Sequence, residues 1–182
     1  MKKAASIFLR AQIEPEDIDL LMQWMANPSV TRYLNEDPEI LRALEQTRAT
    51  VSAPMLTYHF NRQGRFFLVC PEESDAIGFV KLREAAQPDV YEIVYAIGEE
   101  QLWGRGYGKG AINSALAKVF FDLRGKAVVA KICPDNHRSI RSVRSCGFQP
   151  AGSEGLLTLH RITMGEYFSQ LRKRSSRSEE EA

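Results

Sequence analysis

The sequence lacks the features that disulfide-stabilised, zinc-binding and membrane proteins need. Its 182 residues include only three cysteines. Cys70, Cys133 and Cys146 form neither a CxxC pair nor a regular spacing, which excludes a disulfide framework and a zinc knuckle. No apolar run approaches the roughly 20 residues of a membrane span. The apolar stretch near the N-terminus ends at Arg10, too early for a signal peptide, so we expect a cytoplasmic protein.

An excess of one charge is also missing. The chain has 24 Lys and Arg against 23 Asp and Glu, a net charge of +1. The broad basic surface of a sequence-independent nucleic-acid binder is therefore absent, and any anion site must be local. The three histidines are isolated and lack a ligand spacing, so no metal site is expected. The length favours one domain, residues 1–170, followed by a charged tail, residues 171–182, that we expect to be disordered because residues 172–181 include no apolar side chain.

Hydrophobic patterning predicts an α/β fold with a mixed, mostly antiparallel sheet flanked by helices. Antiparallel strands come first, and a single strand, helix, strand crossover follows. The pattern predicts strands at 7–13, 66–70, 76–82, 91–97, 127–133 and 156–162, and helices at 15–26, from Asp37-Pro38 onward, at 111–123 and from Asn136 to Gly147, with a terminal helix or amphipathic cover at 164–171.

The most informative segment lies between the strand 91–97 and the helix that follows it. It reads Trp103-Gly104-Arg105-Gly106-Tyr107-Gly108-Lys109-Gly110. Glycine at alternate positions lets backbone N–H groups approach a ligand closely, and the helix N-terminus adds partial positive charge. With Arg105 and Lys109 adding formal charge, the segment predicts a pyrophosphate site. The alternative is a mobile glycine-rich turn whose basic side chains are solvated.

Two nucleotide-binding motifs can be compared with this segment. A Walker A loop does not fit, because the spacing from Gly104 to Gly108 is one residue too short and Lys109 is followed by glycine. A dinucleotide fingerprint is met by Gly106, Gly108 and Ala111, so an NAD-binding oxidoreductase is an alternative. Only one further strand and helix follow, which leaves little room for a full dinucleotide-binding domain.

Three segments together resemble the GNAT superfamily of acetyl-CoA-dependent N-acetyltransferases: the strand 91–97, the turn 103–108, and the stretch from Asn136 to Phe148. The W-G-x-G-Y-G form of the turn and the N-x-x-S ahead of G-F are similar to the branch that includes ribosomal-protein alanine N-acetyltransferases. The resemblance covers about residues 6–165. It implies an enzyme that moves an acetyl group from acetyl-CoA to a primary amine by direct attack in a ternary complex. A non-catalytic CoA-binding module is the other class left open.

The resemblance also implies how acetyl-CoA would be held. The backbone amides of the turn would bind the pyrophosphate, and the exposed main chain of the preceding strand would carry the pantetheine, as an extended amide chain can be recognised at a strand edge. Asn136 and Ser139 would contact the cofactor from the next helix. The candidate cofactor residues are Tyr95, Ala96, Ile97, Gly104, Arg105, Gly106, Tyr107, Gly108, Lys109, Asn136 and Ser139.

Glu92 is the candidate general base, because it is an ionisable side chain in an apolar strand and matches a glutamate of that branch. Its alternative role is an ion pair with Lys81 or Arg83. Val143 stands where many members have a tyrosine general acid, so protonation of the leaving thiolate is unassigned. A thiol pKa of about 8 to 9 lets a thiolate leave without strong acid help.

The acceptor is a primary amine, and Arg32 and Tyr33 are the candidate residues on its side of the site. Deprotonating an α-amine at pH 7 costs about 1 kcal/mol, against about 4.6 kcal/mol for a lysine amine. This difference favours a protein N-terminus or another weakly basic amine. Polyamines, amino acids and aminoglycoside-like antibiotics stay open as acceptors, as do a monomer and a homodimer.

Overall fold

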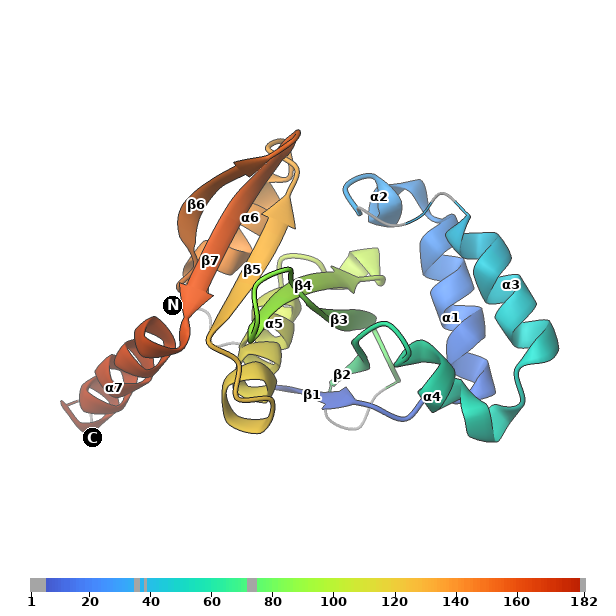
Figure 1. Ribbon diagram of the computed structural model, residues 1–182, viewed down its shortest axis with the longest axis horizontal. Coiled ribbons are helices and arrows are strands. Elements are labelled where there is room, and N and C mark those ends of the chain that lie inside the picture. The colour runs from blue at the N-terminus through green and yellow to red at the C-terminus, as the bar shows by residue number, and fades with distance from the viewer. Residues whose placement is uncertain (1–5, 35–36, 38, 72–74, 181–182) are drawn as a thin grey trace. The chain divides into compact units, whose positions relative to one another are not determined.

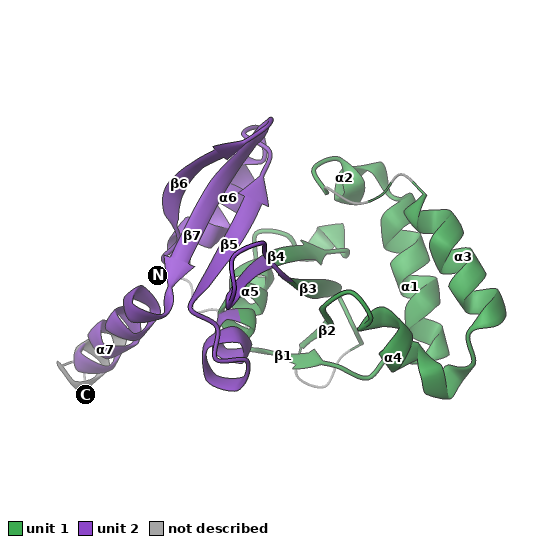
Figure 2. Ribbon diagram, viewed as in Figure 1, with its two compact units in different colours: residues 1–83, 93–115 green, residues 84–92, 116–182 purple. Residues whose placement is uncertain are grey.

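The computed structural model of the chain describes residues 6–34, 37, 39–71 and 75–180 (Figure 1). It divides into two compact units, residues 1–83 with 93–115 and residues 84–92 with 116–182 (Figure 2). Seven strands are hydrogen-bonded in the order β1-β2-β3-β4-β5-β7-β6. The predicted mixed, mostly antiparallel sheet is confirmed, whereas the prediction of a single domain over residues 1–170 stays a prediction.

The first unit holds the N-terminal helices and four of the strands. β3, β4 and α5 begin in one unit and end in the other. The elements are β1 (Ile7–Arg10), α1 (Pro15–Ala26), α2 (Pro28–Thr31), α3 (Ile40–Thr50), η1 (Ala53–Met55), α4 (Leu56–Phe60), β2 (Arg65–Pro71), β3 (Gly78–Glu84), β4 (Val90–Ile97), η2 (Glu100–Leu102) and α5 (Tyr107–Ala117).

The start of α1 follows from its local sequence. Pro15 occupies the first turn, and the side chain of Asp17 accepts a hydrogen bond from the backbone N–H of Glu14 at 2.7 Å. Asp17 is buried and also receives two hydrogen bonds from the guanidinium of Arg10, at 2.7 and 2.9 Å. These bonds tie the end of β1 to the start of α1. The prediction that Asn27 ends this helix is confirmed.

The region between α3 and β2 was left without a predicted structure, and it contains η1 and α4. These short helices depend on tertiary contacts, since Leu56 is buried and the ring of His59 lies 3.1 Å from the hydroxyl of Thr47 on α3. Such contacts leave no periodic signal in a five-residue segment. Pro38, with which the second helix was predicted to start, and residues 72–74 of the predicted hairpin turn lie outside the described residues.

The strands of the first unit bury both faces. β2 and β3 form the predicted antiparallel hairpin, with Phe67 opposite Val80 and Leu68 opposite Phe79. Side chains of one face pack with α1, α3 and α4 in a single apolar cluster that includes Trp24 and Ala96. Because successive strand residues alternate between faces, the intervening residues turn to the opposite face.

The second unit consists mainly of the C-terminal part of the chain. α7 extends beyond the predicted cover and stays helical to Glu180. Residues 172–181 include no apolar side chain that could anchor this part of the chain. Disorder of the tail therefore stays a prediction. The elements are η3 (Lys118–Asp122), β5 (Ala127–Ile132), α6 (His137–Ser145), β6 (Gln149–Glu154), β7 (Leu157–Thr163) and α7 (Met164–Glu180).

The sheet of the second unit combines one parallel and two antiparallel pairings. β5 runs parallel to the start of β4, over the pairs Val90↔Ala127 to Glu92↔Val129, and antiparallel to β7. β6 and β7 form a hairpin with an irregularity between Pro150 and Ser153. The helix predicted to run to residue 123 ends earlier as α-helix, because Lys118–Asp122 form a π turn in which the N–H of Leu123 reaches the carbonyl of Lys118 at 3.1 Å.

Candidate functional site

The glycine segment forms a turn whose backbone requires glycine at two positions. Gly104 and Gly106 have φ angles of +75° and +94°. Residues with a Cβ adopt this left-handed region only at a cost, so side chains at these positions would strain the turn. Helix α5 begins at Tyr107, directly after the second of them. The segment is therefore a short turn, 103–106, that leads into a helix, and Gly108 and Lys109 belong to the first helical turn.

Gly108 differs from the other glycines of the segment. Its φ is not positive, and a Cβ at this position would make only an ordinary contact, 3.5 Å from Cε2 of Tyr95. Neither the backbone nor the packing of the protein therefore requires glycine here. A ligand that lies against the helix N-terminus would require it, because such a ligand would need the space that a methyl group would fill.

The first turn of α5 presents backbone N–H groups. The N–H of Gly110 reaches the carbonyl of Gly106 at 3.0 Å, so the N–H groups of residues 107–109 precede the first intrahelical bond. The macrodipole adds partial positive charge at this end. Arg105 is exposed and Lys109 is half-buried beside it in sequence. The residues present fit a pyrophosphate.

Trp103 has a structural role that the sequence did not reveal. Its indole N–H donates to the carbonyl of Ile97 at 2.7 Å, which ties the turn to the end of β4. The turn η2 is also anchored to α1, because the indole N–H of Trp24 donates to Glu99 at 2.9 Å. The side chain of Trp103 thus positions the turn.

The end of β4 brings the predicted strand residues next to this turn. Tyr95 is half-buried and its ring lies at the first turn of α5. Ala96 is buried on the face covered by α1, and its carbonyl approaches Gly78 so closely that a Cβ there would lie 2.1 Å away. Any contact of Ala96 with a ligand must therefore use its main chain.

Glu92 lies in the second unit, within the parallel pairing of β4 and β5, where it is opposite Val129. Its carboxylate is 3.4 Å from the ammonium of Lys131, which also bonds Glu154 at 2.7 Å. The hydrogen bond to Glu154 raises the pKa of Lys131, burial opposes this, and the charge of Glu92 adds to it. Lys131 was missed by the sequence analysis, although a lone lysine in an apolar strand is the same kind of signal as Glu92.

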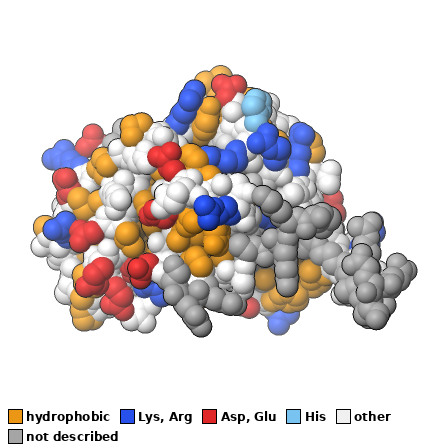
Figure 3. Space-filling model, turned by 180° about the vertical axis from the view of Figure 1, so that it is seen from behind, with side chains coloured by type: hydrophobic (Ala, Val, Ile, Leu, Met, Phe, Trp, Pro, Cys, Tyr) orange, Lys and Arg blue, Asp and Glu red, His pale blue; other side chains and the backbone are white. Residues whose placement is uncertain are grey.

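Asn136 and Ser139 belong to the second unit, at the start of α6. The side chain of Asn136 accepts a hydrogen bond from the backbone N–H of Ser139 at 3.1 Å, which confirms its predicted role as helix cap. Val143 is fully buried, and its aliphatic side chain offers no group for acid catalysis. Basic side chains gather over α6 at the upper right of Figure 3, and Arg138 and Arg141 are exposed.

Arg32 and Tyr33 follow α2 in the first unit. The guanidinium of Arg32 lies 5.1 Å from the centroid of the Tyr33 ring. Arg32 is exposed and Tyr33 is half-buried. This pair offers an aromatic and cationic surface, and its role toward an acceptor stays a prediction.

The fold and the glycine turn agree with comparisons to known proteins. A family described as "Acetyltransferase (GNAT) domain" matches residues 7–149. The match covers most of the chain, and the chain belongs to this family of N-acetyltransferases. Family membership decides against the oxidoreductase alternative.

Two curated relatives are similar in sequence. An uncharacterised N-acetyltransferase of Bacillus licheniformis is 29% identical over 147 residues, which are 80% of this chain and 79% of the relative. An uncharacterised protein of Methanocaldococcus jannaschii is 28% identical over 141 residues, which are 76% of this chain but only 27% of that longer protein.

Solved structures share the fold at low sequence identity. A spermidine N-acetyltransferase from Vibrio cholerae, in complex with CoA and spermine, has a TM-score of 0.71 and 22% identity, covering 89% of this chain and 98% of that one. An aminoglycoside acetyltransferase in complex with coenzyme A has a TM-score of 0.74 and 18% identity, covering 92% of this chain and 99% of that one. At these identities the likeness concerns the fold alone.

The described residues lack the features of two other classes of protein. Among them, no helix is both long and apolar enough to cross a membrane. In the same residues, no group of three or more His, Cys, Asp or Glu side chains could hold a metal ion.

Proposed function

We propose that this chain transfers the acetyl group of acetyl-CoA to the α-amine of a peptide or protein N-terminus. The cofactor assignment depends mainly on the turn at Gly104 and Gly106, which leads into α5. It also depends on Gly108, where the protein itself would accommodate a Cβ. Coenzyme A in the names of two structural relatives supports the same cofactor.

The cofactor would be held mainly by the glycine turn and the start of α5. The N–H groups of residues 107–109, with Arg105 and Lys109, bind the pyrophosphate, because a helix N-terminus favours an anion. The main chain of residues 95–97 takes up the pantetheine amides. For Asn136 and Ser139 at the start of α6, the support for cofactor contacts is the resemblance of the stretch from Asn136 to Phe148 to the family.

The reaction is a direct attack that needs no covalent enzyme intermediate. The nitrogen lone pair of the amine attacks the thioester carbonyl, a C–N bond forms, the C–S bond breaks, and CoA leaves as a thiolate. The ammonium proton passes to the carboxylate of Glu92. A backbone N–H of β4 stabilises the oxyanion. Val143 has no ionisable group, so no side chain at that position protonates the thiolate.

The α-amine fits this site better than a lysine amine. Glu92 is the one candidate base, and its carboxylate already faces the ammonium of Lys131 at 3.4 Å. A site with a single paired carboxylate suits an amine that needs only about 1 kcal/mol for deprotonation at pH 7. The W-G-R-G-Y-G turn, similar to the ribosomal-protein alanine N-acetyltransferase branch, favours the same acceptor.

The test is an initial-rate assay of CoA release with purified full-length protein and four acceptors. They are a peptide with a free N-terminal alanine and acetylated lysines, the same peptide with a blocked N-terminus and free lysines, spermidine, and an aminoglycoside. We expect turnover of the first peptide alone. Faster turnover of spermidine or the aminoglycoside refutes the acceptor, and binding of acetyl-CoA without transfer to any amine indicates a non-catalytic module.

A further inference from the structure

The end of helix α1 packs against the segment that leads to the glycine turn. Trp24, in the last turn of α1, is only 1% exposed. Gly98 packs so closely on its indole ring that a Cβ there would overlap the ring. The indole N–H donates to the carboxylate of Glu99 at 2.9 Å. One side chain therefore contacts two successive residues between β4 and η2.

Asn27, between α1 and α2, makes a second contact with the same segment. Its side-chain amide group donates to the carboxylate of Glu100 at 2.6 Å. The oxygen of this amide accepts from the backbone N–H of Ser29 at 2.9 Å and so caps α2. The main-chain carbonyl of Asn27 accepts from the N–H groups of Val30 and Thr31, each at 3.0 Å. The same residue therefore starts α2 and bonds η2.

These contacts connect the candidate acceptor side to the candidate cofactor side, and all of them lie within the first unit. α2 leads directly into Arg32 and Tyr33, the candidate residues on the acceptor side. η2 leads into the turn 103–106 and from there into α5. The N–H groups of Leu102 and Trp103 bond to carbonyls of η2 and its cap, each at 3.0 Å. Such local bonds do not attach η2 to α2, whereas the side chain of Asn27 does.

A ligand at the turn changes the entropy of this connection. The bond from Asn27 to Glu100 has an ionised acceptor, which makes it stronger than a bond between neutral groups. When a bound ligand fixes the turn, η2 loses freedom, and a bond to a partner that is already fixed costs less entropy. Binding at the turn therefore stabilises α2, and by linkage an ordered α2 strengthens binding at the turn.

We propose that Asn27 is a positioning residue for acetyl transfer: through its bond to Glu100, acetyl-CoA at the turn holds α2 in place, and with it Arg32 and Tyr33. The bond from Trp24 to η2 supports the same connection. In this role Asn27 acts through Glu100 and is not a catalytic residue. The inference rests on the proposed function, because it takes the turn as the cofactor site and the residues after α2 as the acceptor side.

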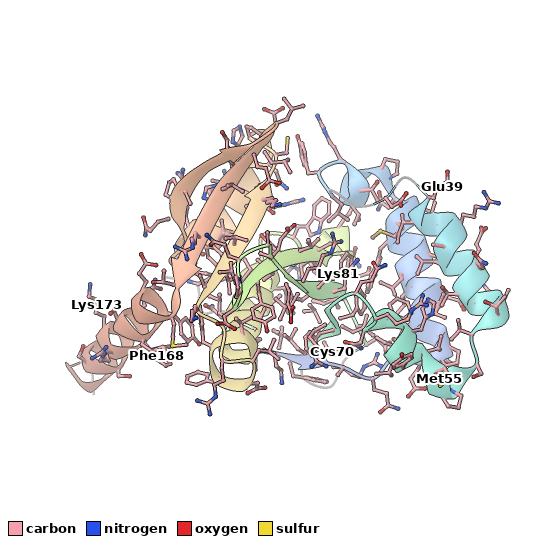
Figure 4. The ribbon with its side chains drawn as sticks, in the orientation of Figure 1. Glu39, Met55, Cys70, Lys81, Phe168 and Lys173 are labelled. Atoms are coloured by element: carbon pink, nitrogen blue, oxygen red, sulfur yellow. The ribbon has the colours of Figure 1, made fainter. Side chains whose placement is uncertain are left out.

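The test is amide hydrogen exchange of the full chain with and without saturating acetyl-CoA, after calorimetry has measured binding of acetyl-CoA. We expect the backbone N–H groups of residues 30–32 to exchange at least about 5-fold more slowly with acetyl-CoA, the lower end of common coupling strengths. Glu39 and Met55 mark opposite ends of the α1–α3 pair in Figure 4, and α2 lies at the Glu39 end. The N–H of Val51, at the other end of α3, should not change.

Asn27→Ser separates the two functions of this side chain. Serine caps helices about as well as asparagine, so α2 keeps its cap, whereas the bond to Glu100 is lost. The protection of residues 30–32 by acetyl-CoA should disappear. The KM of the acceptor should rise about 5-fold or more with kcat unchanged, since binding rather than chemistry is affected. Glu100→Ala should act in the same way, and Glu100→Gln, which keeps an oxygen acceptor, should retain the protection.

Arg48→Ala provides a matched control. The guanidinium of Arg48 bonds Asp19 at 2.6 Å, which is another exposed side-chain bond of the first unit, but it joins α3 to α1 and not to η2. Its loss should leave the protection of residues 30–32 intact.

Three results would overturn the inference. They are protection that persists in Asn27→Ser, protection that is lost equally in Arg48→Ala, and binding of acetyl-CoA to the wild-type chain without slower exchange in α2. The last comparison needs no variant, so it decides the inference even where a substitution prevents folding. If calorimetry detects no binding of acetyl-CoA, the proposed function fails together with this inference, whereas binding without protection overturns this inference alone.

Discussion

Replacing Gly108 by alanine should change stability and cofactor binding in opposite directions. The residue is the second of α5, its φ is not positive, and the new Cβ would lie 3.5 Å from the Tyr95 ring without a clash. Alanine in place of glycine in a helix stabilises a protein by about 0.5–1 kcal/mol. For a chain of this length the melting temperature should rise by about 1–4 °C.

The same methyl group would lie where the pyrophosphate approaches the N–H groups of residues 107–109. Loss of one charge-assisted hydrogen bond costs about 1.5–3 kcal/mol. The Kd of acetyl-CoA should therefore rise about 10- to 150-fold, as measured by isothermal titration calorimetry.

Gly165 offers a matched control, because it is the second residue of α7, is exposed, and a Cβ there would meet nothing within 4 Å. Gly165→Ala should stabilise the chain similarly and leave the Kd of acetyl-CoA unchanged. Unaltered acetyl-CoA binding in Gly108→Ala, together with the higher melting temperature, would refute the pyrophosphate site at the start of α5.

Three further predictions concern charges in the two units. Glu92→Gln should lower kcat/KM for the α-amine by about 100-fold and flatten the pH–rate profile, as expected for a general base, whereas Glu154→Gln, which removes the other partner of Lys131, should leave both unchanged; equal effects of the two would assign Glu92 to the ion pair instead. His160 is buried, and burial together with the charge of Arg144 lowers its pKa. The imidazole is thus kept neutral in the folded state, so the free energy of unfolding should fall as the pH drops below the unfolded pKa of 6.5, by up to about 1.4 kcal/mol per pH unit, and urea denaturation of His160→Gln at pH 7.5 and 5.5 should lack this component. Asp17→Asn should destabilise the chain by about 3 kcal/mol because the half-buried Arg10 loses its counter-ion, and a fall in melting temperature of less than about 2 °C would contradict this.

Much of the fold could be predicted from local patterns. The helix ended by Asn27, the β2–β3 hairpin and the Asn136 cap each depend on residues within one or two turns of one another. Their signals are periodic apolar residues, fixed turn residues and capping side chains, and these act before tertiary packing. The segments that were missed, η1, α4 and the π turn at Lys118–Asp122, lack such local signals.

The candidate site likewise has one part that the sequence predicts and another that it does not. The glycine turn could be predicted from the sequence because a left-handed backbone conformation favours glycine. Gly104 and Gly106 have such positive φ angles. The partner of Glu92 could not, because Lys131 lies on the next strand, 39 positions away in the printed sequence. Pairing across strands depends on register, which local patterns do not determine.

The amino-acid sequence by itself determined the mixed sheet, the glycine turn before α5 and membership of an acetyl-transferring family, since these depend on residue types at short spacing. Only the tertiary structure decided that the indole of Trp103 donates to the end of β4 and that a Cβ at Gly108 would clash with nothing in the protein. Each of these depends on which side chains meet across different elements. Those contacts form only when strands and helices from distant parts of the chain pack together, and that packing sets the chemistry available at each site.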